Sequence, residues 1–299
     1  MTRSPLLFDL VLVPTMLLCV AMAVSAQTSY PQATAAAAPN SESRGSAPKS
    51  FRNDNEADDS KVVAAYLDAL RLAPNDAGLY NNLGTAYDRQ QRYEDAARML
   101  EKAISLDPNM AVALYNLGIV YDHLGQLPAA LRVTRQAVSG DPQHILARAH
   151  LCELHLALQQ HDEAVNCYEV LMGSAPADAT SRTNYGSALK RANRIDKALV
   201  VWEETVRLFP NSPEAYNQLG VVFVKTRRYD KAIIVLRRAV ELAPNLDEPR
   251  YNLAIAELAT RNRSAALEHY AVLKRANSEL AQQLHKVIYR NRLLMADPK

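Results

Sequence analysis

The chain has 299 residues, of which 48% are apolar and 22% are charged, and its formal net charge is +2. That composition is typical of a soluble, globular protein. Glycine is scarce and β-branched alternation is sparse, whereas Ala, Leu, Arg and Glu are abundant. The balance argues against a β-rich fold and favours helices.

Residues 1–26 are predicted to be a secretory signal peptide that is cut after Ala26, because an apolar run over residues 6–24 leads to a small residue at the cleavage position. The alternative is an uncleaved membrane anchor, since this run approaches the length that spans a bilayer. Asp9 and Pro14 interrupt the run and favour cleavage. We therefore predict a bacterial protein exported to the periplasm or cell envelope, with anchoring in the inner membrane through residues 6–24 as the alternative.

Residues 27–60 form a polar, low-complexity tract that ends in the acidic stretch NDNEADDS. Such a segment cannot bury enough apolar surface to offset the entropy lost on ordering. We predict a disordered linker that joins the export signal to the folded part.

The rest of the chain repeats with a period of 34 residues. Proline recurs at this interval, and a helix usually ends before such a residue. A small residue and an alanine recur in the same phase, as expected where two helix backbones approach closely. The prolines are Pro74, Pro108, Pro142, Pro176, Pro210 and Pro244. The small residues are Gly84, Gly118, Cys152, Gly186, Gly220 and Ala254. The alanines are Ala96, Ala130, Ala164, Ala198, Ala232 and Ala266.

Large apolar residues at spacings of three and four around these positions predict a pair of amphipathic helices in each repeat. Two partial units flank the full repeats. Residues 61–76 match the second helix of a degenerate repeat, and residues 281–299 contain an amphipathic helix suited to capping a stack, followed by a tail. The six full repeats are expected at 77–110, 111–144, 145–178, 179–212, 213–246 and 247–280.

This pattern of small, tyrosine, alanine, aromatic and proline positions resembles the tetratricopeptide repeat (TPR) family. The resemblance implies an all-α fold, an α-solenoid that winds as a right-handed superhelix. It would hold six full helix-turn-helix repeats, a degenerate N-terminal unit and a C-terminal capping helix. It also implies that the first helix of each pair lines the concave face.

One position on that face is polar in every repeat, and every side chain there can both donate and accept a hydrogen bond. The resemblance implies a ladder that grips the backbone of an extended peptide. The alternative is that these side chains bond to a neighbouring helix, since buried amides are usually satisfied. The ladder consists of Asn82, Asn116, His150, Asn184, Gln218 and Asn252.

Neighbouring positions on the same helices are expected to set partner specificity. Six of them are the leading candidates, and Asp88, Arg89, Asp122 and Arg191 lie beside them. Charge is divided along the array, with 7 basic and 12 acidic residues in 77–178 against 17 and 11 in 179–280. The second half could steer an acidic partner, and the alternative is a solvated surface of helical ion pairs. The candidates are Asn81, Tyr115, Lys190, Asn217, Lys225 and Tyr251.

Cys152 and Cys167 fall at matched depths on the two helices of the third repeat. In an exported protein they are candidates for a disulfide, and the alternative is two small packing residues. His150, His155 and His161 lack the spacing of a helical metal site, so we predict no metal. No phosphate loop, nucleophile elbow or zinc motif is found, so neither an enzyme nor a cofactor is expected.

The sequence therefore predicts a non-enzymatic scaffold that binds an extended segment or helix of a partner protein in its concave groove. The alternative is an assembly factor of an envelope complex, such as a pilus or secretion system, that acts through its convex face or ends. Nucleic acid is not expected as a partner, because no binding motif accompanies the basic residues.

Overall fold

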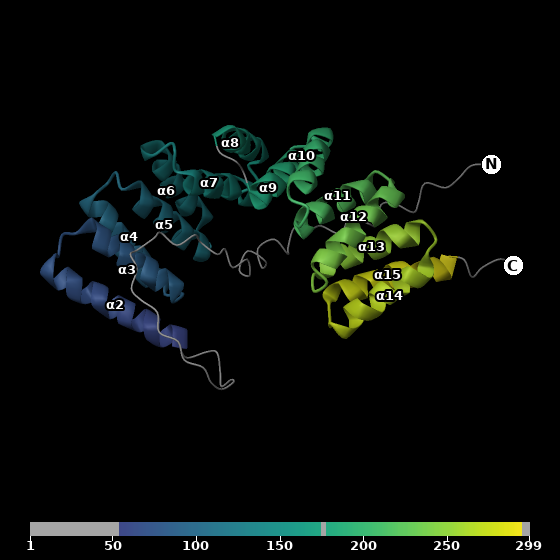
Figure 1. Ribbon diagram of the computed structural model, residues 1–299, viewed down its shortest axis with the longest axis horizontal. Helices are drawn as coiled ribbons and strands as arrows, with labels where there is room; N and C mark the ends of the chain where they lie inside the picture. The colour runs from purple at the N-terminus through teal and green to yellow at the C-terminus, as the bar shows by residue number, and fades with distance from the viewer. Residues whose placement is uncertain (1–53, 175–177, 295–299) are drawn as a thin grey trace, which may run out of the picture. The chain divides into compact units, whose positions relative to one another are not determined.

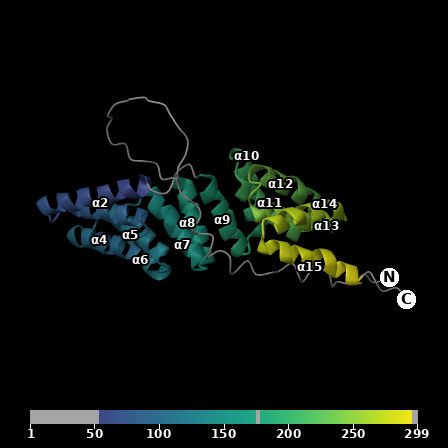
Figure 2. The same cartoon turned by 90° about the horizontal axis from the view of Figure 1, so that it is seen from below.

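The computed structural model describes residues 54–174 and 178–294, and every regular element in these ranges is an α-helix. Residues 51–299 form one compact unit, in which successive helices lie side by side (Figures 1 and 2). The predicted signal peptide and most of the predicted linker lie outside the described residues. None of the helices in the described part is long and apolar enough to cross a membrane.

The helices follow the 34-residue period. One helix, α2 (Asp54–Leu72), precedes the six full pairs, and another, α15 (Glu279–Leu294), follows them. The first helices of the pairs are α3 (Ala77–Arg89), α5 (Ala111–His123), α7 (Ile145–Ala157), α9 (Ala179–Arg191), α11 (Pro213–Lys225) and α13 (Asp247–Ala259). The second helices are α4 (Tyr93–Leu106), α6 (Leu127–Gly140), α8 (His161–Ser174), α10 (Ile195–Leu208), α12 (Tyr229–Leu242) and α14 (Arg263–Arg275).

Helix α2 begins earlier than the sequence predicts. It starts at Asp54, inside the segment expected to be a disordered linker, and not near residue 61. The stretch DNEADDS forms its first turns, so the predicted linker overlaps this helix over residues 54–60.

The helices stack in a solenoid whose first helices form an inner layer. Each first helix packs on its own second helix, and that second helix packs on the next first helix. The first helices of neighbouring repeats also touch, as α9 touches α11 and α11 touches α13, and no comparable contact joins second helices in the described residues. Because the inner layer is the closer-packed one, the first helices lie on the concave side of the stack.

The small position of each repeat allows this close packing. A Cβ atom added at Gly186 would lie 2.3 Å from Nε1 of Trp202, and one added at Gly220 would lie 2.3 Å from Cγ of Leu236. Trp202 and Leu236 are fully buried. The large side chain of the second helix thus crosses the first helix at a residue without a side chain and reaches toward the inner face.

The turn inside each repeat has the same left-handed residue. Gln91, Gly125, Gln159, Asn193, Arg227 and Arg261 all have φ between 58° and 70°. The next N–H bonds back to the first helix, as Arg92 N does to Tyr87 O at 2.9 Å and Arg228 N does to Phe223 O at 2.8 Å. These bonds end the first helix in the manner of a Schellman motif, although only the second repeat uses glycine.

Both ends of the array are covered by single helices. At the C-terminal end, Leu284 and Ile288 of α15 are buried in one cluster with Ala254 and Leu273 of the last repeat. At the N-terminal end, Val63 and Leu70 of α2 join the cluster that holds Leu83. Two single helices therefore shield the apolar ends of the stack, as repeat proteins require.

Candidate functional site

The candidate site is the inner layer of first helices, where polar side chains link each repeat to the one before it. Asn116 donates from Nδ2 to Asn81 Oδ1 at 2.9 Å, and Asn252 donates to Asn217 Oδ1 at 3.0 Å. Asn184 donates from Nδ2 to Glu153 Oε1 at 3.2 Å. Three amides of the ladder are thus held in the same orientation, with the nitrogen toward the preceding repeat.

The other ladder residues also have polar partners. Lys190 Nζ donates to Gln218 Oε1 at 2.8 Å, and Asn81 donates to Asn82 Oδ1 at 3.2 Å. Asn82 is exposed, and Asn116, Asn184, Gln218 and Asn252 are half-buried. The ladder residues therefore bond to protein neighbours, and their role in gripping a partner stays a prediction.

His150 is the ladder residue that is buried, with only 5% of its surface exposed. Its Nε2 lies 3.2 Å from Asp122 Oδ2, and its Nδ1 lies 3.3 Å from Thr134 Oγ1. A carboxylate can only accept, so Nε2 donates to Asp122 and, in the neutral imidazole, Nδ1 accepts from the threonine hydroxyl. This polar group lies where the apolar cluster of the first two repeats gives way to the next one.

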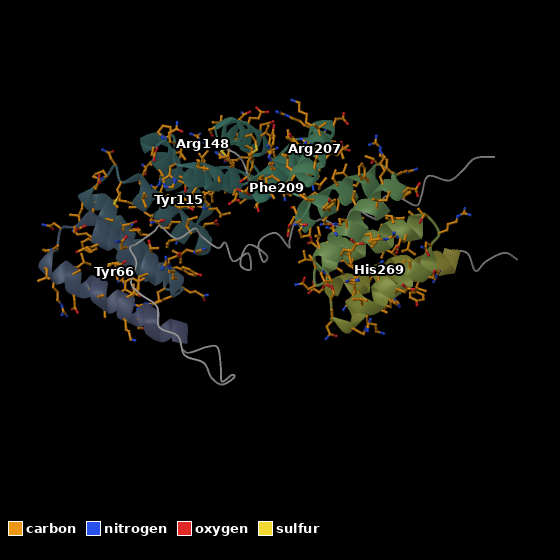
Figure 3. The ribbon with its side chains drawn as sticks, in the orientation of Figure 1. Tyr66, Tyr115, Arg148, Arg207, Phe209 and His269 are labelled. Carbon is orange, nitrogen blue, oxygen red and sulfur yellow. A yellow bond between two sulfur atoms is a disulfide. The ribbon has the colours of Figure 1, made fainter. Side chains whose placement is uncertain are left out.

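The predicted specificity residues differ in their accessibility. Asn81, Tyr115 and Asn217 are buried, and Tyr115 packs its ring against those of His144 and His150. Lys190 and Tyr251 are half-buried, and Lys225 is exposed. Figure 3 shows Tyr115 among the side chains of the first half of the array. The buried members hold neighbouring helices together, and contact with a partner is left to the accessible ones.

Sequence reasoning missed two residues of this layer, Glu153 and Tyr168. Glu153 lies one turn after His150 on α7, and Tyr168 comes from α8, where it fills the large position of the third repeat. Glu153 is exposed on its outer side, but the protein atoms packed around its carboxylate remove water from it and raise its pKa. His150 lowers this pKa, and the negative charge of Asp122 raises it further. The i, i+3 spacing from the ladder could have revealed Glu153, whereas only the fold brings Tyr168 to it.

A second carboxylate–histidine contact lies further toward the N-terminus. His123 Nδ1 and Asp88 Oδ1 are 2.9 Å apart, on α5 and α3. The hydrogen bond to Asp88 raises the pKa of His123, against a smaller effect of burial. The carboxylates of the inner layer in the first three repeats are therefore accompanied by histidines and amides.

A disulfide joins Cys152 on α7 to Cys167 on α8, with the Cα atoms 5.3 Å apart. Cys152 occupies the small position that glycine holds in most repeats, and it is fully buried. The bond therefore joins the two helices of the third repeat, at a point of α7 that lies between His150 and Glu153 in the sequence.

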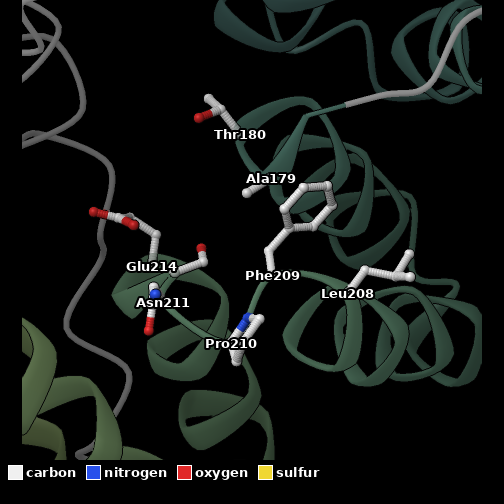
Figure 4. A pocket seen from close by; sticks show the side chains of 8 residues that line it. Ala179, Thr180, Leu208, Phe209, Pro210, Asn211 and Glu214 are labelled. Atoms are coloured by element: carbon white, nitrogen blue, oxygen red, sulfur yellow. The ribbon is translucent and has the colours of Figure 1, made fainter.

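A shallow pocket of about 380 Å³ lies at the junction of the fourth and fifth repeats. Figure 4 shows the ring of Phe209 beside Ala179, with Asn211 and Glu214 on the other side. Glu214 is its single carboxylate, and no lining residue pairs a nucleophile with a base. Within the described residues, no group of three or more His, Cys, Asp or Glu side chains could hold a metal ion.

Helix pairs of equal length, stacked with small residues between the helices, define a helical-repeat solenoid, a class of protein that presents an extended concave surface. Tetratricopeptide repeat family models match residues 63–111, 81–145 and 186–247, and a second model of the same repeat matches 124–183. The chain belongs to the tetratricopeptide repeat family. Members of this family are generally interaction scaffolds. A search among curated proteins found no match.

Three solved structures illustrate the likeness. A solved chain of MamA from Desulfovibrio magneticus RS-1, described as 41 to the end, is 25% identical, with a TM-score of 0.54. The match covers 57% of this chain and 97% of that one. PilW, described as a widely conserved type IV pilus biogenesis factor, is 20% identical with a TM-score of 0.63. The match covers 70% of this chain and 97% of the PilW chain. YrrB, described as a TPR protein with an unusual peptide-binding site, is 21% identical with a TM-score of 0.55. The match covers 62% of this chain and 96% of the YrrB chain.

Proposed function

We propose that this protein is a non-enzymatic scaffold that holds an extended segment of a partner protein against its inner layer of first helices. The observation that carries the proposal is the common orientation of Asn116, Asn184 and Asn252. Each amide nitrogen is used by the preceding repeat, and no hydrogen bond occupies the Oδ1 atoms within the described part of the chain. Three half-buried acceptors are thereby available to backbone N–H groups of a bound segment.

The test must separate gripping from stacking, because an alanine at the ladder also removes a bond between repeats. N116A/N252A removes both the groove acceptors and the bonds to α3 and α11. N81A/N217A removes the same two inter-repeat bonds but keeps the acceptors. Binding of both variants would be measured to an array of unstructured peptides, with circular dichroism as the folding control. We expect N116A/N252A to lose about tenfold or more in affinity, since each lost hydrogen bond is worth roughly 1 kcal/mol, while N81A/N217A stays near wild type. Equal losses would show that the ladder only joins repeats.

We further propose that the scaffold works outside the cytoplasm, in the periplasm or cell envelope. The support comes from the apolar run over residues 6–24 and the small residue at Ala26. The Cys152–Cys167 disulfide fits an oxidising compartment. Sequencing the mature amino terminus tests this proposal, and a start at Gln27 is the expected result. A retained Met1 with the protein in the membrane fraction would favour the anchored alternative.

A second candidate function is assembly of an envelope complex through the second helices, and one observation favours it. Val200 on α10 and Ile234 on α12 are 64% and 68% exposed, and they occupy the same position in successive repeats. PilW, a protein of the same fold, is described as a pilus biogenesis factor. Crosslinked pull-downs from the native envelope distinguish the two functions. Partners lost by V200E/I234E but kept by N116A/N252A would support assembly through the outer helices.

A further inference from the structure

The inner layer of the second and third repeats holds two carboxylates that form no ion pair with lysine or arginine within the described part of the chain. Asp122 on α5 is 41% exposed at its side chain, and Glu153 on α7 is exposed. His150 contacts Asp122 through Nε2, and among the described residues no Lys or Arg forms an ion pair with either carboxylate. Some exposed acids of the second helices are paired with arginine, as Asp162 is with Arg194 at 2.7 Å.

A buried hydroxyl completes this group of side chains. Tyr168 is fully buried, and its hydroxyl oxygen has no hydrogen-bond partner within the part of the chain that the structure describes. The hydroxyl is close enough to Glu153 and Asn184 for both to influence its pKa, which burial raises. An unsatisfied buried hydroxyl is costly, so it points to a network that is completed when a ligand draws these side chains together.

The oxygen atoms at this place accept hydrogen bonds and carry negative charge. Glu153 has one oxygen left after its bond to Asn184 Nδ2, Asp122 has Oδ1, and Asn184 has its carbonyl oxygen. An ammonium group offers three donors and no acceptor, and a guanidinium offers five. The set therefore matches an organic cation in both charge and hydrogen bonding.

We propose that Asp122, Glu153 and Asn184, backed by Tyr168, form a subsite for a lysine or arginine side chain of the bound segment. The proposal rests on the proposed function, because the segment itself lies along the inner layer. Glu153 gives the third repeat a charge at a position that is uncharged in the other five repeats. The residues there are Thr85, Ile119, Ser187, Val221 and Ile255. The cation would therefore fix the register of the segment at the third repeat.

The charge of the surrounding repeats supports a basic segment over an acidic one. Residues 77–178 contain 12 acidic and 7 basic residues. Asp88 lies on α3, two repeats before Glu153, and its partner is His123. A basic segment that runs from the third repeat toward α3 would thus meet carboxylates along its length, and these would also accelerate its encounter at low salt.

The experiment uses the full mature chain and a fluorescent 12-residue peptide of alternating Lys and Ser. Its matched partner has every lysine acetylated, which removes the charge and keeps the length. We expect the lysine peptide to bind with an affinity that falls as salt rises. We also expect E153Q to weaken this binding at least tenfold, and D122N/E153Q to weaken it further. E163Q, which removes an exposed charge from α8, is the control variant and should stay within twofold of wild type.

Tyr168→Phe gives an independent readout, because it removes one buried hydroxyl without changing the charge. We expect about threefold weaker peptide binding with a melting temperature equal to or above that of wild type. A role in folding alone would lower the melting temperature and leave affinity unchanged. Spermidine should compete poorly with the peptide, since it offers cations without a backbone for the ladder.

The outcomes separate this inference from the proposed function. If uncharged peptides bind as tightly as the lysine peptide and E153Q has no effect, the subsite is wrong while the ladder stands. If E163Q weakens binding as much as E153Q, the attraction is general and the subsite is again wrong. If spermidine competes as well as the peptide, the ligand is a free polyamine. If no peptide binds, both proposals fail.

Discussion

The second and fourth repeats place side chains of opposite charge at the same position of the inner layer. Asp122 lies in the last turn of α5 and contacts His150, the ladder residue of the next repeat, at 3.2 Å. Lys190 lies in the last turn of α9 and contacts Gln218, the equivalent ladder residue, at 2.8 Å. The fold supplies the same contact to the next repeat in both cases, and the side chain alone decides whether the groove is acidic or basic there.

The two regions also differ beneath the ladder. Under His150 lies Thr134, a small hydroxyl, whereas Trp202 fills the corresponding position and the ammonium of Lys190 lies 5.5 Å from its ring centre. Trp202 also donates from Nε1 to Thr183 O at 3.0 Å. The basic side chain of Lys190 thus lies over a large aromatic residue of the second helix. The acidic side chain of Asp122 contacts a histidine whose other nitrogen bonds to a small hydroxyl residue. Four predictions test how side-chain support and charge act in this stack.

Trp202→Ala should have the largest effect, a loss of about 3–5 kcal/mol in the free energy of unfolding, because it empties a fully buried site. Thr134→Ala removes far less volume at the same position of the second repeat, and we expect a loss of about 1 kcal/mol. Urea unfolding followed by circular dichroism measures both. Equal losses would contradict the view that the two regions are supported differently.

The disulfide at the boundary of the two regions should contribute about 3 kcal/mol, the amount associated with closing a loop of about 15 residues. A reductant should therefore lower the unfolding midpoint of wild type. C152A/C167A serves as the control, because its midpoint should be low from the start and indifferent to reductant. A wild-type midpoint that does not move under reductant would argue against a bonded pair.

Glu257→Gln should stabilise the last repeat by about 1 kcal/mol at pH 8. Burial raises the pKa of Glu257, and the charge of Arg237 opposes this. Because the pKa of Glu257 is higher in the folded state, this residue stabilises the fold most at pH values below its pKa in the unfolded chain. That contribution is lost as pH rises through its pKa in the folded protein. Glutamine stays neutral, so the gain should be present at pH 8 and shrink toward pH 4.

The matched control for this variant is Glu203→Gln, which removes an exposed carboxylate from α10, two repeats before Glu257. His269, labelled in Figure 3, is the neighbour of the buried carboxylate. Its Nε2 lies 3.3 Å from Glu257 Oε2, and burial lowers the pKa of His269. Thermal melts at several pH values measure the difference. A gain from E257Q that is equal at pH 4 and pH 8 would be inconsistent with a buried acid.

Asp88→Asn should have the smallest effect, a few tenths of a kcal/mol, because its pair with His123 is partly exposed and solvent screens it. Asp88 raises the pKa of His123, so its contribution is complete below the unfolded pKa near 6.5 and is lost as pH rises through the folded value. The variant should be less stable than wild type at pH 5.5 and equal to it at pH 8.5. Titration of His123 by NMR gives the direct check.

The 34-residue period, the small positions and the helix pairs could be read from the sequence, because each depends on residues close together in the chain. The turns were harder to predict. Gln91, Arg227 and Arg261 adopt left-handed backbone conformations that usually indicate glycine, and here the packing of the two flanking helices imposes them. The start of α2 at Asp54 was missed because its acidic composition also suits a disordered segment.

The amino-acid pattern alone places six polar residues on the first helices, but it leaves open whether they bond to a neighbouring helix or to a partner. The partners of these side chains within the protein become known only from the folded stack. Asn116 and Asn252 each bond to a residue 35 positions earlier in the chain. The partner of Asn184 lies 31 positions earlier, and the partner of His150 lies 28 positions earlier. These offsets depend on how far each repeat is rotated relative to the last, which no single repeat encodes. Tyr168 and Glu153 lie on the two helices of one repeat, and the packing of that helix pair brings them close enough for Glu153 to raise the pKa of Tyr168.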